Sequence, residues 1–211
     1  MNLNRLLLFT KFPIPGFVKT RLIPLLGANA SAGLHKTLTE ITVNNILAAK
    51  SLCDFVPEVQ FTGADHYQTL NWLGPRFIYK KQVEGSLGHR MSFAFKMAFD
   101  MGFSKVVAIG CDTPYISPEI LSQAFQQLND NDVIIGPASD GGYYLLGIKC
   151  FCPDIFENID WGSSIVLSQT FERIAQRALK VSLLTVLSDI DRPADFLTFL
   201  KRFDFCEHFS I

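Results

Sequence analysis

The chain has 211 residues, of which 48% are hydrophobic and 18% are charged, so its composition is typical of a folded domain and excludes an intrinsically disordered chain. Its formal net charge of −1 excludes a broad basic surface for nucleic acid, so any cationic site must be local. No apolar run approaches the roughly 18 residues of a membrane span, and the amino terminus lacks a signal-peptide pattern, so we expect a cytoplasmic protein.

The first half of the sequence alternates between predicted strands and helices. The apolar run at residues 5–10 is typical of a buried strand, and a stretch rich in proline and glycine follows it. Apolar residues at helical spacing predict the helices further along the chain. In chain order, this half is predicted to hold a strand at 5–10, a helix from Ser31, strands at 54–61 and 77–80, and a helix at 86–101 with Leu87, Met91, Phe95 and Ala98 on one stripe.

The second half continues the same alternation. Ser117 followed by Pro118 is typical of a helix N-terminus, because serine caps well and proline suits the first helical position. In chain order, this half is predicted to hold a strand at 105–110, a helix from Pro118, strands at 132–136 and 143–148, a helix capped by Ser163 or Ser164 and ending near Gln176, a strand at 181–187 and a helix from Pro193.

Strands that alternate with helices predict a mostly parallel sheet covered on both faces, which is a three-layer α/β/α architecture. The sequence shows no internal repeat, low-complexity segment or linker. We therefore expect one domain over residues 1–211. In such an open sheet, ligands bind beyond the carboxyl ends of the strands, so the residues that follow each strand are the candidates for function.

The loop after the first strand, PIPGFVKTRL at residues 13–22, places two cations in a tight bend. Pro13, Pro15 and Gly16 fix the bend, and Lys19 and Arg21 follow. A lysine ammonium and an arginine guanidinium both suit phosphate oxygens. The stretch matches neither a Walker loop nor G-x-G-x-x-G, and a solvated surface pair is the alternative. The loop therefore carries a hypothesis of phosphate binding that needs partners elsewhere in the chain.

Two aspartates also follow predicted strands. Asp112 comes directly after the strand at 105–110, and Asp191 follows the last strand. If these strands are neighbours, the two carboxylates lie together, where with substrate phosphates they suit Mg²⁺ or Mn²⁺. The alternatives are an Asx turn at Asp112 and a helix cap at Asp191. The Asp-Asn-Asp run at 130–132 precedes its strand and is expected at the opposite edge of the sheet.

Two further segments carry polar residues of interest. Asp140, Gly141 and Gly142 lie between two predicted strands, so a hairpin turn is the leading interpretation and a ligand contact the alternative. Gln82 and Arg90 flank a predicted helix start, where an arginine could meet a phosphate or a base. A surface ion pair at Arg90 is equally compatible with the sequence.

Taken in order, the segments KFPIPGFVKTRL, QVEGSLGHRM, IGCDTP, GPASDGGYYLLGI, IDWGSS and DIDRPADF resemble a family of uncharacterised bacterial proteins. The family has the nucleotide-diphospho-sugar transferase fold (glycosyltransferase A, Rossmann-like) and is linked by name to arsenosugar biosynthesis. The resemblance covers roughly residues 5–200. It implies the same fold here, with a nucleotide over the first half of the sheet.

The resemblance also implies roles for individual residues. Lys19 and Arg21 match a K-T-R-L element, Asp112 matches a G-x-D-x-P element, and Asp191 matches a D-x-D-x-P-x-D element. Cys111 and Thr113 look exchanged relative to the commoner order, Ser163 and Arg192 replace threonines, and Arg192 adds a charge beside Asp191. The implied sites are catalytic Asp140 and Lys19; nucleotide- or phosphate-binding Lys11, Gly16, Lys19, Arg21, Gln82 and Arg90; sugar- or acceptor-binding Asp140, Gly141, Gly142, Tyr143 and Trp161; and Mg²⁺- or Mn²⁺-binding Asp112 and Asp191.

Three functions remain open at this point. The leading expectation is a metal-dependent glycosyltransferase with a nucleotide-diphospho-sugar donor and a small-molecule acceptor. The first alternative is a nucleotidyltransferase that joins a nucleoside triphosphate to a phosphorylated acceptor and releases pyrophosphate. The second is a nucleotide-binding module without catalysis. We expect a monomer or homodimer, with neither nucleic acid nor membrane as a partner.

Overall fold

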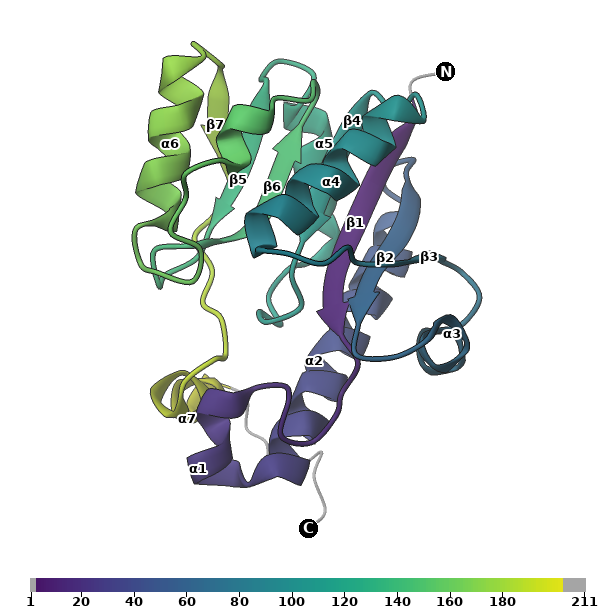
Figure 1. The fold of residues 1–211 in the computed structure, drawn as a ribbon, viewed down its shortest axis with the longest axis vertical. Coiled ribbons are helices and arrows are strands. Elements are labelled where there is room, and N and C mark those ends of the chain that lie inside the picture. The colour runs from purple at the N-terminus through teal and green to yellow at the C-terminus, as the bar shows by residue number, and fades with distance from the viewer. Residues whose placement is uncertain (1–2, 203–211) are drawn as a thin grey trace.

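A computed structural model of the protein describes residues 3–202, and its strands form one seven-stranded sheet within that range (Figure 1). The strands are β1 (Asn4–Lys11), β2 (Val56–Thr62), β3 (Ile78–Lys81), β4 (Lys105–Ile109), β5 (Val133–Pro137), β6 (Tyr143–Ile148) and β7 (Val181–Leu183). Their spatial order is β3-β2-β1-β4-β6-β5-β7. Only β6 runs antiparallel to its two neighbours, β4 and β5. The mostly parallel α/β sheet expected from the sequence is therefore confirmed.

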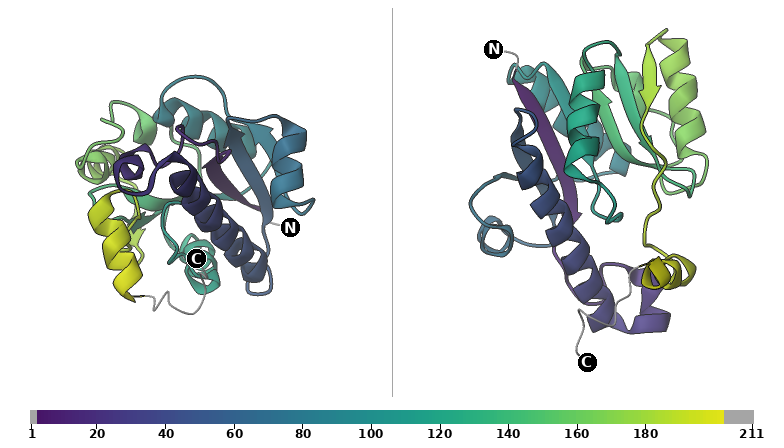
Figure 2. Two further views of the ribbon diagram at one scale, coloured as in Figure 1. Left: turned by 90° about the horizontal axis from the view of Figure 1, so that it is seen from below. Right: turned by 180° about the vertical axis from the view of Figure 1, so that it is seen from behind.

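Helices cover both faces of this sheet, as Figure 2 shows from behind and from below. They are α1 (Ile23–Leu26), α2 (Ala28–Ala49), α3 (His66–Leu73), α4 (Leu87–Asp100), α5 (Pro118–Gln127), α6 (Val166–Gln176) and α7 (Pro193–Arg202), with short 3₁₀ helices η1 (Thr20–Leu22) and η2 (Pro153–Phe156). Side chains alternate along β1, so Leu6 and Leu8 join a core cluster with α2 and α5, whereas Leu7 joins one with α4. Two apolar layers therefore hold the sheet between helices.

A third, smaller core lies beyond the carboxyl ends of the parallel strands. There α1, the N-terminal part of α2 and α7 come together below the sheet (Figure 1), and we call this group the lower lobe. Its buried residues are Leu22, Leu38, Ile190 and Phe199. Because Ile190 precedes α7, this small core fixes the path of residues 189–191 against the α2 side of the molecule.

Most predicted elements are present within a few residues of their predicted bounds. The Ser117 hydroxyl caps α5 by accepting a hydrogen bond from the Ile120 amide, and Ser86 caps α4 in the same way. The residues at 140–142 form the predicted hairpin turn between β5 and β6. In the part of the chain that the structure describes, no helix combines the length and the apolar character needed to cross a membrane.

Several local predictions were wrong. The helix α6 has no side-chain cap, because the Ser163 hydroxyl donates to the Asp160 carbonyl and Ile165 occupies the cap position. The last strand ends at Leu183 rather than 187, after which Leu187 makes only an isolated bridge to Ala138. Pro137 at the end of the neighbouring β5 lacks an amide donor, so the ladder is interrupted there, and it resumes at Leu187, whose amide donates to the Pro137 carbonyl.

The stripe of buried apolar residues on α4 is also shorter than predicted. Met91, Phe95 and Ala98 are buried, but Leu87 at the start of the helix is 44% exposed. The sequence patterns also missed α1 and α3, which are short. The helix α3 begins with a capping box in which Asp65 and Gln68 bond each other's backbone amides, a local signal that the spacing of apolar residues does not contain.

Candidate active site

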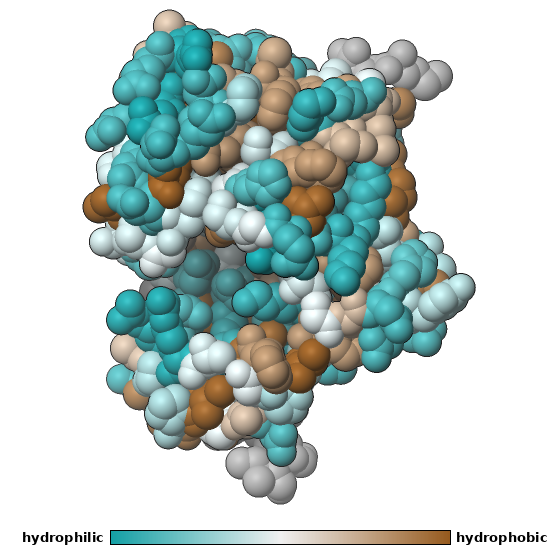
Figure 3. All heavy atoms as spheres, in the orientation of Figure 1, coloured by the Kyte–Doolittle hydropathy of each residue, from teal (hydrophilic) through white to brown (hydrophobic). Residues whose placement is uncertain are grey.

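A cleft of about 580 Å³ opens between the carboxyl edge of the sheet and the lower lobe. Figure 3 shows it as a hollow lined largely by hydrophilic residues, between the larger upper part of the molecule and the smaller lower part. Its lining comes from the ends of β1 and β4, the loop after β1, the start of α4, the β5–β6 hairpin and the segment before α7. A cleft of this size at this edge of an α/β sheet is the usual place for a ligand.

The loop after β1 brings both of its cations to the cleft. Gly16 has φ of +87° and Lys19 has φ of +46°, so the bend uses left-handed backbone twice. This conformation costs lysine more than glycine, and it directs the Lys19 side chain inward, where the ammonium is almost fully buried. The Arg21 side chain is half-exposed at the cleft. Gly16 shapes the turn but does not itself line the cleft.

Both cations meet the two aspartates that the sequence singled out. The Lys19 Nζ lies 2.5 Å from Asp112 Oδ1 and 4.0 Å from Asp191 Oδ1, and it donates to the Ile190 carbonyl at 2.6 Å. The Arg21 guanidinium pairs with Asp191 Oδ2 at 2.6 Å. All four side chains therefore form one network of charges at the carboxyl edge of the sheet.

Asp191 reaches Asp112 by a route that the sequence analysis did not foresee. The proposed condition was that their strands be neighbours, but β6 and β5 lie between β4 and β7. Instead, the chain leaves β7 and returns across the strand ends, where the Ile190 amide donates to the Asp112 carbonyl at 2.9 Å. A loop held by the lower lobe, rather than strand pairing, brings these carboxylates together.

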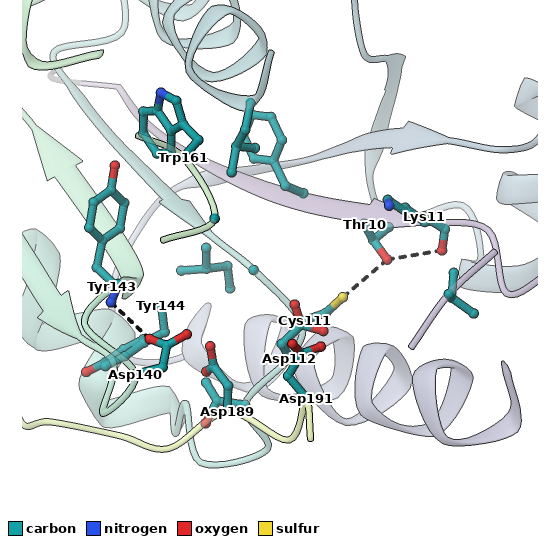
Figure 4. A pocket seen from close by; sticks show the side chains of 18 of the residues that line it. Thr10, Lys11, Cys111, Asp112, Asp140, Tyr143, Tyr144, Trp161, Asp189 and Asp191 are labelled. Carbon is teal, nitrogen blue, oxygen red and sulfur yellow. Dashed lines mark hydrogen bonds between the residues drawn. The ribbon is translucent and has the colours of Figure 1, made fainter. Parts of the chain in front are cut away.

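A third carboxylate, Asp189, belongs to the same group and was missed as a candidate. Burial raises the pKa of Asp189 from its ordinary value of 3.8 to about 7, with a further contribution from the negative charges of Asp112 and Asp140. Figure 4 shows Asp140, Asp189, Asp112 and Asp191 along one side of the cleft. The period-two spacing of Asp189 and Asp191 was the signal that could have identified it.

The chemistry of this group fits a divalent cation. Oδ1 of Asp189 is buried and has no hydrogen-bond partner among the described residues. Lys19 and Arg21 pair with Asp112 and Asp191, whereas Asp140 and Asp189 make no ion pair among the described residues. Carboxylate oxygens are the ligands that Mg²⁺ and Mn²⁺ prefer, and a buried oxygen without a partner is costly unless one is supplied.

A second group of potential metal ligands, His35, Cys111 and Asp112, lies deeper in the cleft. The His35 Nε2 is 2.9 Å from the Lys11 carbonyl, which can only accept, so this nitrogen carries a proton and cannot bind a metal. Burial raises the pKa of the Cys111 thiol to about 11. His35 therefore keeps a lone pair on Nδ1 only and the Cys111 thiol stays protonated, so the all-oxygen carboxylate group suits Mg²⁺ or Mn²⁺ better than this group.

The β5–β6 hairpin contributes Asp140, Gly142 and Tyr143 to the cleft, whereas Gly141 serves the turn and does not line it. The exposed Asp140 accepts a hydrogen bond from the Gly142 amide at 2.9 Å, an Asx-type turn that agrees with the leading interpretation of this segment as a hairpin. Trp161 stands edge-on to the Tyr143 ring, with centroids 6.2 Å apart, and also lines the cleft. The hairpin residues thus form a structural turn and also line the cleft, where a ligand can reach them.

Gln82 and Arg90 line the side of the cleft next to β1. The Gln82 amide donates to the Thr10 and Gln60 carbonyls, while Arg90 Nε donates to the Gly85 carbonyl at 2.8 Å. Arg90 makes no ion pair among the described residues, so the structure does not support a surface ion pair there. Lys11, at the end of β1, is exposed at the same side.

Comparisons with known proteins agree with this architecture. A model of the family described as "uncharacterized protein conserved in bacteria (DUF2064)" matches residues 45–163. A candidate nucleotide-diphospho-sugar transferase of Desulfovibrio desulfuricans G20, solved by crystallography, is 33% identical, with a TM-score of 0.85 over 98% of this chain and 91% of that one. No curated protein matches the sequence.

Two more distant structures show the fold alone. A Methanothermobacter nucleotidyl transferase is 15% identical, with a TM-score of 0.61 over 98% of this chain and 100% of that one. The Mycobacterium tuberculosis H37Rv protein Rv0371c, solved in complex with manganese, is 12% identical, with a TM-score of 0.52 over 96% of this chain and 100% of that one. The fold of the sheet and its helices is therefore shared with a structure described as a nucleotidyl transferase and with Rv0371c.

Proposed function

The chain belongs to the DUF2064 family of uncharacterised bacterial proteins, and on that basis we propose that it is a metal-dependent glycosyltransferase. Its donor is a nucleotide-diphospho-sugar and its acceptor a small molecule. The family membership and the fold support a transferase that binds a nucleotide. The choice of glycosyl transfer follows the relative from Desulfovibrio desulfuricans, which is a candidate nucleotide-diphospho-sugar transferase.

One observation carries the proposal. Lys19, Arg21, Asp112 and Asp191, which are far apart in the sequence, meet in one charge network at the carboxyl edge of the sheet. A diphosphate bridged by a divalent cation needs this combination, because cations neutralise the phosphate oxygens while carboxylates hold the metal. Neither the two cations alone nor the two carboxylates alone would distinguish a ligand-binding site from a solvated surface.

In this site the phosphates lie against the loop after β1. Arg21 offers a planar fork and Lys19 a mobile charge, and the exposed Lys11 adds a third cation at the same side. Gln82 and Arg90, fixed by their bonds to backbone carbonyls, border the nucleoside. Asp112 and Asp191 would hold the divalent cation, and Asp189 lies beside them in the cleft.

The bound metal would stabilise the negative charge that develops on the departing nucleoside diphosphate. Lys19 and Arg21 offset the same charge from the protein side. Asp140 lies at the hairpin with one carboxylate oxygen free of the turn bond, so it orients the acceptor hydroxyl and accepts its proton. Tyr143 and Trp161 form the aromatic wall against which the sugar or acceptor packs.

A nucleotidyltransferase is the second candidate. It is favoured by the fold shared with the Methanothermobacter nucleotidyl transferase. The same charge network would then act on the α-phosphate of a nucleoside triphosphate, with pyrophosphate as the leaving group. The two candidates differ in which nucleotide the site holds rather than in which residues hold it.

The experiment is a scan of thermal unfolding with UDP, GDP and CDP, their sugars and the nucleoside triphosphates, each with and without Mn²⁺. A ligand at about 100 times its dissociation constant adds about 2.7 kcal/mol of stability, which gives a clear rise in melting temperature. The proposal predicts a metal-dependent rise with one diphosphate and its sugars. A rise confined to triphosphates would replace it with nucleotidyl transfer, and a rise independent of metal would favour a binding module.

A further inference from the structure

The Lys19 side chain occupies an unusual position for a phosphate-binding lysine. Its side chain is only 2% exposed, whereas a lysine that awaits an anion normally extends into solvent. The ammonium lies on the carboxylate side of the cleft, against Asp112 and the carbonyl of Ile190. In this state it faces the metal-binding group rather than the open cleft.

The atoms around the ammonium resemble the ligand set of a cation. Its contacts are one carboxylate oxygen of Asp112, one of Asp191 and the Ile190 carbonyl oxygen, at 2.5, 4.0 and 2.6 Å. Carboxylate and backbone oxygens are also what a hard divalent cation takes. An ammonium and a divalent cation cannot share Asp112 Oδ1 at such distances, because their charges repel.

We propose that Lys19 is an internal competitor for the metal: in the nucleotide-free protein its ammonium occupies the cation position, and it leaves when phosphates bind. This inference rests on the proposed function, which supplies the nucleotide and the metal. The phosphate oxygens attract the ammonium into the cleft, and the carboxylates that it leaves then receive the divalent cation. The ammonium exchanges its carboxylate partners for phosphate oxygens, and the carboxylates exchange the ammonium for the divalent cation, so no charge is left without a partner.

The loop that carries Lys19 is suited to this change. Lys19 itself has left-handed backbone, at φ 46° and ψ 41°, a conformation that a non-glycine residue holds at a cost. Before it, the Phe12 amide donates to the Thr62 carbonyl, and the other backbone bonds of residues 12–17 are short-range, from Ile14 to Phe12 and from Phe17 to Ile14. The side chain has four rotatable bonds, so the ammonium can move while the backbone beyond Leu22 stays in the core.

Coupling between the two ligands follows. A metal that must displace the ammonium binds weakly to the nucleotide-free protein, and a nucleotide that draws the ammonium away strengthens metal binding. By linkage, the metal strengthens nucleotide binding by the same factor. Without Lys19, the metal meets free carboxylates from the start, so its affinity no longer depends on this exchange.

The test is a titration of nucleotide-free protein with Mn²⁺, in which free Mn²⁺ is followed by electron paramagnetic resonance. Lys19→Met, which keeps the length and apolar stem of the side chain, should bind Mn²⁺ at least about tenfold more tightly than the wild type. Lys81→Met is the matched control, because it removes an exposed lysine at the carboxyl end of β3 that does not line the cleft and makes no ion pair among the described residues. It should change the affinity by less than about threefold.

Lys19→Gln provides a second variant in case the Met variant does not fold, and thermal unfolding checks both. If a folded Lys19 variant binds Mn²⁺ with an affinity equal to or weaker than that of the wild type, the proposal that Lys19 competes with the metal is overturned. If the wild type then still binds Mn²⁺ once UDP, GDP or CDP is added, the proposed function survives that result. If no form of the protein binds Mn²⁺ with or without these nucleotides, the metal site itself is wrong, and both proposals fail.

Discussion

At the scale of single residues, Lys19 and Arg21 differ in burial although both lie in one short loop. The Arg21 side chain is 56% exposed and pairs with Asp191 at the surface of the cleft, so water screens this pair and its contribution to stability is small. A phosphate that takes the place of water there would make charge-assisted bonds with the guanidinium. Arg21 is therefore expected to matter for binding more than for folding.

Arg21→Ala should weaken binding of the nucleotide identified in the thermal scan by roughly 1–3 kcal/mol, with little change in melting temperature. Isothermal titration calorimetry measures the affinity. Arg76→Ala, which removes an exposed arginine outside the cleft, is the control and should bind as the wild type. Equal affinity in the two variants would contradict the phosphate role of Arg21.

Asp189 gives a prediction about pH. Its pKa of about 7 in the folded protein lies above its ordinary value of 3.8, so between these values the folded state binds more protons than the unfolded state. The contribution of Asp189 is therefore most favourable at low pH, and stability falls as the pH rises towards 7. Asp189→Asn removes this loss and should stabilise the metal-free protein more at pH 8 than at pH 5.

The expected difference between the two pH values is roughly 1–3 kcal/mol in the free energy of unfolding. Urea unfolding with a chelator present at both pH values measures it, and Asp130→Asn, an exposed change at the other edge of the sheet, is the control. A stabilisation of Asp189→Asn that does not depend on pH would show that the folded-state pKa is not raised.

The sequence identified some of the residues of the site, but it did not predict how they are arranged. Lys19, Arg21, Asp112 and Asp191 could be found because each follows a strand or matches a motif. Asp189 was missed because its burial and its unpartnered oxygen arise only when the segment before α7 crosses the strand ends. The direct contact of Lys19 with Asp112 could not be predicted either, because it depends on left-handed backbone at a non-glycine residue.

At the scale of elements, two adjacent glycines of the β5–β6 hairpin, Gly141 and Gly142, have different structural roles. Gly141 has φ of +92°, and a Cβ there would lie 2.0 Å from the Ser164 carbonyl oxygen, which is backbone and cannot move easily. Gly142 has no such φ, and its nearest contact for a Cβ is the Asp140 side chain at 3.2 Å. The turn therefore packs against the loop before α6 only if residue 141 is glycine.

Gly141→Ala should destabilise the protein by about 2–4 kcal/mol, since strain and a backbone clash act together, whereas Gly142→Ala should cost less than about 1 kcal/mol. Chemical denaturation of the two variants provides a matched comparison at neighbouring positions. Similar losses in both would mean that the hairpin does not pack against Ser164 as described.

The elements that were predicted well are those whose signals are local. The alternation of buried strands and amphipathic helices identified the sheet, and Ser117 and Pro118 identified the start of α5. The errors at Ser163 and at the end of β7 have tertiary causes. Ser163 bonds to the Asp160 carbonyl within its loop, and the pairing of β7 is interrupted beside Pro137, which has no amide to donate, before it resumes at Leu187.

At the scale of the whole molecule, the lower lobe makes the second wall of the cleft. It joins the chain after β1 to the chain before α7, two regions that are about 170 residues apart in the sequence, through Leu22, Leu38 and Ile190. The same packing holds Lys19, Asp112 and Asp191 in contact. The order of strands in the sheet was not predictable from the sequence pattern, and neither was the packing of the lower lobe beyond the strand ends.

The proposed function requires that a nucleotide and a divalent cation meet at Asp112. The most direct measurement is calorimetric titration of the nucleotide found in the scan into wild-type protein and into Asp112→Asn, each with Mn²⁺ and with chelator. We predict that Mn²⁺ strengthens binding at least about tenfold in the wild type and has no effect in Asp112→Asn. Equal strengthening by Mn²⁺ in both proteins would contradict it, because the metal would then bind without this carboxylate.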